Sequence, residues 1–166
     1  MADAYEYLLE HFKEYDFIWS SPPCPSHSRF RKNFSIPAGA KPLYPDMKLY
    51  EEILLLQSYY KGKYCVENVI SFYKPLVTPQ VLQRHYFWTN FIIQNAVFQP
   101  DNLEISGREN KNSSRDIQKR LEKTFGFSLD KYKINKMLVL RNCVSPELGL
   151  HILNGAMGKN TQNILF

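Results

Sequence analysis

The sequence of 166 residues is poor in cysteine and glycine, and it has no long hydrophobic run. Three cysteines without the paired spacing of a zinc site predict neither a disulfide framework nor a bound metal, and this usage suits a reducing cytoplasm. No apolar run approaches the length that spans a bilayer, and the N-terminus leads straight into charged residues, which predicts no signal peptide. We therefore expect a cytoplasmic protein that has no membrane partner.

The composition predicts a single globular domain with a basic surface. Hydrophobic residues make up 44% of the chain and charged residues 22%, which argues against a disordered polypeptide. The formal net charge of +5 is compatible with a polyanionic partner such as nucleic acid, although many basic proteins bind none.

A cysteine follows a short apolar run near the N-terminus. Residues 16–19 are apolar and aromatic, which is typical of a buried strand, and small polar residues and prolines then end the run. Because Pro22 and Pro23 each fix a backbone angle, the thiol of Cys24 leaves the strand in a defined direction. We interpret Cys24 as a nucleophile at a strand end, and a buried structural cysteine is the alternative.

A second apolar run, residues 64–69, ends on the carboxylate of Glu67. Residues 47–61 between the two runs predict a helix, so strand, loop, helix and strand form the βαβ unit of a parallel sheet. Ligands of such sheets lie at the carboxyl ends of the strands, which is where Cys24 and Glu67 fall.

Together these two motifs resemble those of the DNA cytosine-5 methyltransferases. Pro22-Pro23-Cys24, followed by Ser28, is similar to the proline-cysteine motif of that family, and Glu67-Asn68-Val69 is similar to its second catalytic motif. The resemblance implies an α/β fold with a partial Rossmann-like sheet of the S-adenosylmethionine-dependent methyltransferases, mostly parallel, and a minimal target-recognition insertion.

The chemistry that the resemblance implies is the addition of a thiolate to C6 of a flipped cytosine, after which C5 attacks the methyl of S-adenosylmethionine. Cys24 would be the nucleophile, and Glu67 would bond N3 and stabilise the charge that develops on addition. Asn68 would hold the loop by backbone bonds, and Arg84, which resembles an arginine of a further family motif, would bind the carbonyl at C2.

The cofactor that the resemblance implies is S-adenosylmethionine, for which Pro22, Asn142 and Val144 match positions of family motifs. The sequence lacks the glycine-rich loop and the acidic residue with which a Rossmann-like domain holds the nucleoside. The chain therefore resembles a truncated or split form of the enzyme. We expect a homo-oligomer or a complementary N-terminal methyltransferase chain to pair with the strand that ends at Pro22.

Residues 29–45 form a basic connection directly after the cysteine motif. Its prolines and glycine predict a mobile loop rather than a helix. Such a loop suits a lid that closes on the phosphates of double-stranded DNA as the target base is flipped, and a solvated surface loop is the alternative. The residues that we expect to contact DNA are Ser28, Arg29, Arg31, Lys32 and Lys41.

The rest of the chain predicts a helix over residues 3–14, a strand over residues 83–93 and a helix over residues 114–125. Residues 70–82 read as a loop with a short helical turn. In terms of the resembled family, residues 1–98 would form the catalytic half and residues 99–130 a minimal target-recognition or linker region. Residues 131–166 would return to the methyltransferase domain.

Two other interpretations stay open. The chain could be a catalytically inactive DNA-binding remnant of such an enzyme, because the cofactor motifs are missing. It could also be an amino-methyltransferase, which methylates exocyclic nitrogens. Ser21-Pro22-Pro23 resembles the motif of these enzymes, although Cys24 stands where that motif has an aromatic residue.

Overall fold

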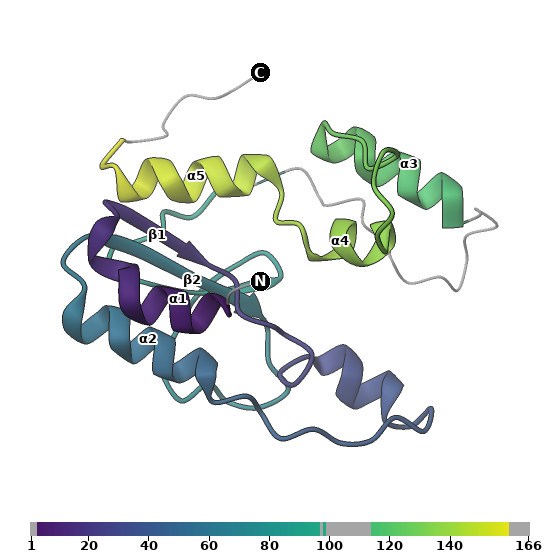
Figure 1. Cartoon of the computed structure of the whole chain (residues 1–166), viewed down its shortest axis with the longest axis horizontal. Helices are drawn as coiled ribbons and strands as arrows, with labels where there is room; N and C mark the ends of the chain where they lie inside the picture. The colour runs from purple at the N-terminus through teal and green to yellow at the C-terminus, as the bar shows by residue number, and fades with distance from the viewer. Residues whose placement is uncertain (1–2, 97, 99–113, 160–166) are drawn as a thin grey trace. The chain divides into compact units, whose positions relative to one another are not determined.

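The computed structural model describes residues 3–96, 98 and 114–159 (Figure 1). The chain forms two compact units, residues 1–95 (unit 1) and residues 96–166 (unit 2), and each is described by itself. Residues 99–113 lie outside the described residues, so the first part of the predicted target-recognition or linker region does too. In the part of the chain that is described, no helix is long and apolar enough to cross a membrane.

Unit 1 contains a four-stranded mixed sheet whose order is β1-β2-β4-β3. The parallel pairing of the first two strands confirms the predicted βαβ unit, whereas the other two pairings are antiparallel. The α/β class is therefore confirmed, and the expectation of a mostly parallel sheet is wrong. The strands are β1 (Phe17–Ser20), β2 (Lys63–Val69), β3 (Gln80–Leu82) and β4 (His85–Thr89).

A tight hairpin explains the mixed sheet. Only Gln83 and Arg84 separate β3 from β4, and a two-residue connection can join only antiparallel neighbours. Gln83 has a φ of 52°, in the left-handed region that such turns use. The sequence did not reveal β3, because three residues directly after Pro79 give too short a pattern to separate a strand from a loop.

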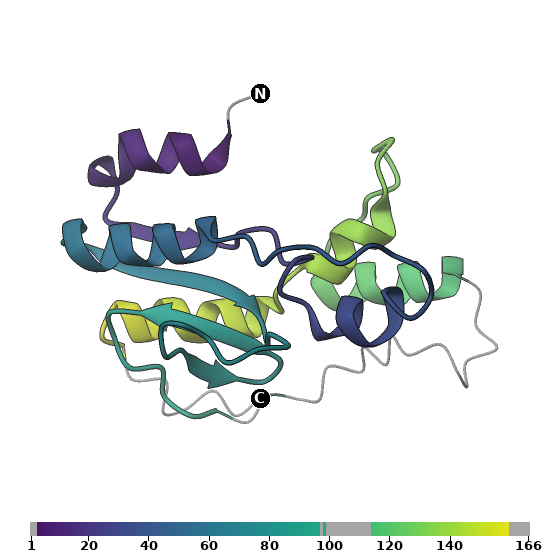
Figure 2. The ribbon, with the colours of Figure 1, turned by 90° about the horizontal axis from the view of Figure 1, so that it is seen from below.

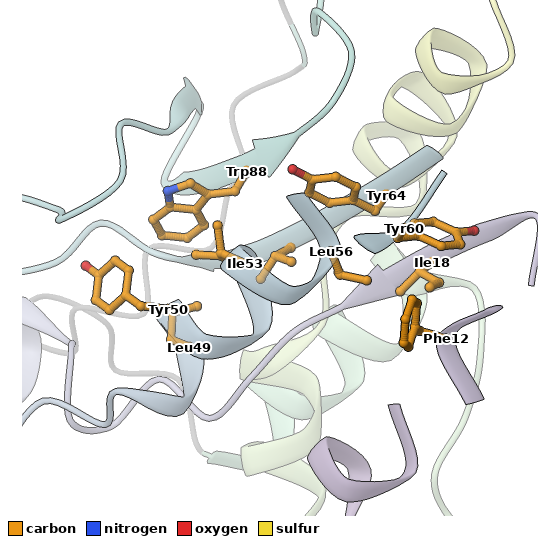
Figure 3. Close-up of a cluster of buried hydrophobic side chains, with 10 residues drawn as sticks. Phe12, Ile18, Leu49, Tyr50, Ile53, Leu56, Tyr60, Tyr64 and Trp88 are labelled. Atoms are coloured by element: carbon orange, nitrogen blue, oxygen red, sulfur yellow. The ribbon is translucent and has the colours of Figure 1, made fainter. Parts of the chain in front are cut away.

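The core of unit 1 lies between the sheet and α2 (Lys48–Tyr59), which connects β1 to β2 (Figure 3). One face of α2 contributes Leu49, Ile53 and Leu56, each at most 2% exposed. Ile18 of β1 and Trp88 of β4 meet this face from the sheet, so the crossover helix fixes the parallel alignment of β1 and β2.

The N-terminal helix packs beside α2 in unit 1 (Figures 1 and 2). The predicted helix over residues 3–14 consists of α1 (Ala4–His11) and the short 3-10 helix η1 (Phe12–Glu14). Asp3 caps α1 by accepting from the backbone amides of its first turn, and the Tyr5 hydroxyl donates to Glu51 of α2 at 2.7 Å.

The basic connection after Cys24 contains a helical segment that the sequence did not predict. η2 (Arg31–Ser35) extends away from the sheet of unit 1 in Figure 2. The expectation that residues 29–45 hold no helix is therefore wrong for this segment. The helix-breaking residues all lie after it, from Pro37 onward, so they end the helix without preventing it.

Unit 2 is helical in its described residues. Its helices are α3 (Ser114–Phe125), α4 (Lys136–Asn142) and α5 (Pro146–Ala156), and α3 and α4 share a core formed by Leu121, Phe125, Leu129 and Leu140. The predicted bounds of α3 are confirmed, and Gly126 ends this helix with a φ of +74°, a conformation that favours glycine.

The burial of one face of α2 predicts that truncating two of its leucines has very different effects on stability. We expect Leu56→Ala to lower the free energy of unfolding by about 3 kcal/mol, because this side chain is fully buried and its truncation leaves a cavity. Urea unfolding followed by the fluorescence of Trp19 and Trp88 measures the effect. Leu54→Ala is the matched control, since Leu54 is 51% exposed and its truncation should change stability by less than about 0.5 kcal/mol. Equal losses for both variants would contradict the placement of α2.

Candidate functional site

The ends of β1 and β2 are tied together by one side chain. Asn68 is 2% exposed, and its Nδ2 donates to the backbone carbonyl of Pro22 at 3.0 Å. Its Oδ1 accepts from the backbone amide of Val69 at 3.0 Å. The amide of Asn68 therefore holds the segment that leads to Cys24 against the end of β2.

Cys24 itself begins a hydrogen-bonded turn. The backbone amides of His27 and Ser28 both donate to the Cys24 carbonyl at 3.0 Å. Ser28 forms a bridge with Ser71, and the amide of Phe72 donates to the carbonyl of His27 at 3.1 Å. The half-buried thiol is thus presented by a loop whose two sides are anchored to neighbouring parts of unit 1.

Cys24 and Glu67 interact electrostatically. Burial raises the pKa of the Cys24 thiol, and the negative charge of Glu67 raises it further, whereas a backbone hydrogen bond acts in the opposite direction. The sequence placed both residues at strand ends; Cys24 lies beyond the end of β1, whereas Glu67 lies within β2, two residues before its end at Val69. In this arrangement the thiol is protonated at neutral pH, and removing the charge of Glu67 would favour the thiolate.

His85 is a partner of Glu67 that the sequence analysis missed. Val69 of β2 pairs with His85 of β4 and Glu67 pairs with Phe87, so Glu67 and His85 are diagonal neighbours on one face of the sheet. Nδ1 of His85 lies 2.5 Å from Oε1 of Glu67, and the Glu67 residue is 7% exposed. The only signal in the sequence was the alternation of β4, which identifies no partner until the strand register is known.

Arg84 lies at the tip of the β3–β4 hairpin, one residue before β4. Because β4 runs antiparallel to β2, its first residue pairs with Val69 at the carboxyl end of β2. Arg84, which comes just before that first residue, therefore lies at the same end of the sheet as Glu67 and Asn68. Its side chain is exposed. Its predicted role in binding a base stays a prediction.

The predicted DNA-contacting residues lie around η2. Arg29, Lys32 and Lys41 are exposed, and Nζ of Lys32 lies 5.1 Å from the ring centroid of Phe72. Arg31 instead has a structural contact, because its Nη2 donates to the carbonyl of Lys41 at 2.8 Å and so closes the loop upon itself. The Ser28 hydroxyl accepts from the amide of Phe30 at 3.2 Å.

A cavity of about 630 Å³ lies along β1 and the Pro-Pro segment. Among the described residues, its lining includes Pro22, one of the predicted cofactor-binding residues, but not Cys24. Within the described sheet β1 is an edge strand that pairs with β2. The cavity lies along this edge strand. This volume lies within the range of small-molecule sites.

The other two predicted cofactor-binding residues belong to unit 2. Asn142 ends α4, and Val144 lies in the connection to α5. Their proposed contact with a cofactor stays a prediction.

Comparison with protein-family models, with curated proteins and with solved structures finds no match for this chain.

The electrostatic contact between Cys24 and Glu67 predicts the reactivity of the thiol. Alkylation of Cys24 by iodoacetamide should have a midpoint above the ordinary thiol pKa of 9.0, since burial and the charge of Glu67 both raise it. Glu67→Gln should lower this midpoint, because it removes the negative charge. Peptide mass spectrometry assigns the label to Cys24 and separates it from the other two cysteines.

Glu6→Gln serves as the control for this experiment, because Glu6 is exposed on α1 and does not contribute to the pKa of Cys24. A midpoint that is the same in Glu67→Gln and in the unmodified chain would show that the carboxylate does not act on the thiol.

Proposed function

We propose that this chain is the catalytic part of a DNA cytosine-5 methyltransferase, with a partner chain completing the site for S-adenosylmethionine. One observation carries the proposal. Cys24 follows the end of β1, Glu67 lies in the adjoining parallel strand β2, and the charge of Glu67 raises the pKa of the thiol. A thiol and a carboxyl group that face one target ring are what addition to cytosine C6 requires.

In the proposed reaction the thiolate of Cys24 adds to C6 of the flipped base, and the electron pair of the C5–C6 bond makes C5 nucleophilic. Glu67 in its acid form donates a hydrogen bond to N3 and stabilises the charge that develops there. C5 then takes the methyl group from the sulfonium of S-adenosylmethionine. Loss of the C5 proton reforms the double bond and expels the thiolate.

The interaction between Cys24 and Glu67 links base binding to activation of the nucleophile. An ionised Glu67 opposes formation of the thiolate, because two negative charges would then lie close together. Once Glu67 carries a proton and bonds N3, this repulsion is gone and the pKa of Cys24 falls. Thiolate formation is therefore favoured when the target base is in place.

His85 acts as a positioning residue in this proposal. Its ring nitrogen holds Oε1 of Glu67 at 2.5 Å, which leaves the other carboxyl oxygen to meet the base. A short contact on one oxygen fixes the rotamer of a carboxyl group whose direction decides whether it reaches N3.

Two exposed aromatic rings beside the cations of the basic connection support DNA as the substrate. Phe30 and Phe34 are 68% and 58% exposed, and their ring centroids lie 5.2 Å apart. Aromatic side chains next to Arg29 and Lys32 suit a surface that contacts both bases and phosphates.

A catalytically inactive DNA-binding remnant is the second candidate. The raised pKa of Cys24 favours it, because an active nucleophile is more often one whose pKa is lowered. In that case the basic connection would still bind duplex DNA, but no methyl group would be transferred.

Transfer of labelled methyl from S-adenosylmethionine to mixed-sequence duplex DNA tests the proposal. We expect Cys24→Ala to abolish transfer, whereas the matched variant Cys143→Ala should retain it, because Cys143 lies in unit 2 and packs against the core there. Transfer that survives in Cys24→Ala would contradict the mechanism. No transfer by the chain, either alone or with a polypeptide that carries a methyltransferase glycine loop, would favour the inactive remnant.

A further inference from the structure

Two phenylalanine rings lie side by side and exposed on the helical segment that follows Cys24. Phe30 directly precedes η2 and Phe34 lies within it, and their ring centroids are 5.2 Å apart with an interplanar angle of 31°. Neither ring is among the core residues of unit 1, from whose sheet η2 extends away (Figure 2). Tyr44, on the returning limb of the same loop, adds a third ring that is 96% exposed. Exposed rings that the core does not use are suited to contact with another molecule.

Two contacts order the segment that carries the ring pair. Nη2 of Arg31 donates to the carbonyl of Lys41 at 2.8 Å, which ties the outgoing limb of the loop to the returning limb. Nζ of Lys32 lies 5.1 Å from the centroid of the Phe72 ring, which lies outside the loop. A surface that is already ordered loses little conformational entropy when it binds a ligand.

The loop around the ring pair carries only positive charge. No aspartate or glutamate occurs from residue 17 to residue 45, so the acidic residues of unit 1 all lie outside this stretch. Arg29, Lys32 and Lys41 are exposed. A polyanion that approaches this loop is therefore attracted by its cations and meets no carboxylate in the loop itself.

Rings and cations on one short segment match a nucleic acid whose bases are unpaired. The cations attract the phosphates of any strand. The rings need a base whose flat face is free, and in a duplex each face is covered by the neighbouring base pair. An unpaired strand turns its bases outward, and such bases stack on aromatic side chains whatever their sequence.

An anionic membrane surface would also attract cations and apolar rings. A helix that lies in a membrane interface presents a continuous apolar face over many residues. η2 spans only five residues, and the polar residues Lys32 and Asn33 come between the two rings in the sequence. The observations therefore favour nucleic acid as the occupant.

We propose that the loop of residues 29–44 binds single-stranded nucleic acid in preference to duplex. Unpaired bases stack on Phe30 and Phe34, and the exposed cations of the loop hold the phosphates. This inference goes beyond the proposed function, which needs contact with DNA but no preference for unpaired strands. It does not depend on methyl transfer.

Fluorescence anisotropy of the full chain with labelled oligothymidylate, oligouridylate and a DNA duplex of equal length tests the proposal. We expect the single strands to bind about tenfold more tightly than the duplex, which is the effect of one stacked base. Tighter binding of either single strand supports the proposal, and comparing the two shows whether DNA or RNA is preferred.

Leucine variants separate stacking from apolar contact. Phe30→Leu and Phe34→Leu keep an apolar side chain but remove the flat ring, so each should weaken oligothymidylate binding about tenfold and leave duplex binding unchanged. Tyr59→Leu is the matched control, because it removes a ring that is 69% exposed at the end of α2. Circular dichroism establishes that each variant is folded.

Two further variants give readouts that a loss of structure would not. Arg29→Gln should lower the slope of log affinity against log salt by about 0.7, the contribution of one phosphate contact on a single strand, whereas Phe30→Leu should leave the slope unchanged. Phe30→Trp should retain binding, and oligothymidylate should quench its added indole fluorescence beyond any change in Trp19 and Trp88.

Four results would overturn the proposal. They are equal or tighter binding of the duplex, unchanged oligothymidylate binding in both Phe30→Leu and Phe34→Leu, no binding of either single strand, and binding to vesicles of anionic phospholipid but not to oligonucleotides.

The outcomes separate this proposal from the proposed function. Single-strand binding that depends on Phe30 and Phe34, without any methyl transfer, would support the stacking site and count against the methyltransferase. Methyl transfer that depends on Cys24, by a chain that binds duplex as tightly as single strands, would do the reverse.

Discussion

The hydrogen bond from Asn68 to the carbonyl of Pro22 is the contact on which the candidate site depends. β1 and β2 are parallel, so both end at the same edge of the sheet, but parallel alignment alone does not fix the loops that follow. Nδ2 of Asn68 donates to the carbonyl of Pro22 at 3.0 Å. The hydrogen-bonded turn that starts at Cys24 follows directly after this segment. Removing this amide would leave the Pro22 carbonyl without this partner and release the segment that leads to Cys24.

Two sets of side chains lie near the Pro-Pro segment. In the proposed reaction Cys24 and Glu67 act together; the charge of Glu67 raises the pKa of the Cys24 thiol, and His85 contacts the Glu67 carboxyl group. His27, three residues after the thiol, turns toward the cavity along β1 instead. The loop that starts at Cys24 thus contains both the proposed nucleophile and a residue that lines the cavity.

Much of the frame could be predicted from local sequence patterns, whereas the partners within the site could not. The apolar runs of residues 16–19 and 64–69 predicted adjoining parallel strands, and residues 47–61 predicted the helix between them. The pairing of Glu67 with His85 depends on the register of β2 against β4, and the hydrogen bonds that link Tyr50, Tyr73 and His27 join residues far apart in the chain. Neither leaves a periodic signal. The mostly parallel sheet was expected from the family resemblance, and β3 with its hairpin was too short to be recognised in the sequence.

The most direct test of the central claim is covalent capture of Cys24 by a modified cytosine. Replacing C5 of the base by nitrogen makes C6 more electrophilic, so duplex DNA that contains this analogue should form a thioether without any methyl donor. We predict that mass spectrometry of the denatured, digested complex finds the base attached to Cys24, and that Glu67→Gln lowers the yield. No adduct, or attachment to Cys65 or Cys143 instead, would contradict the account.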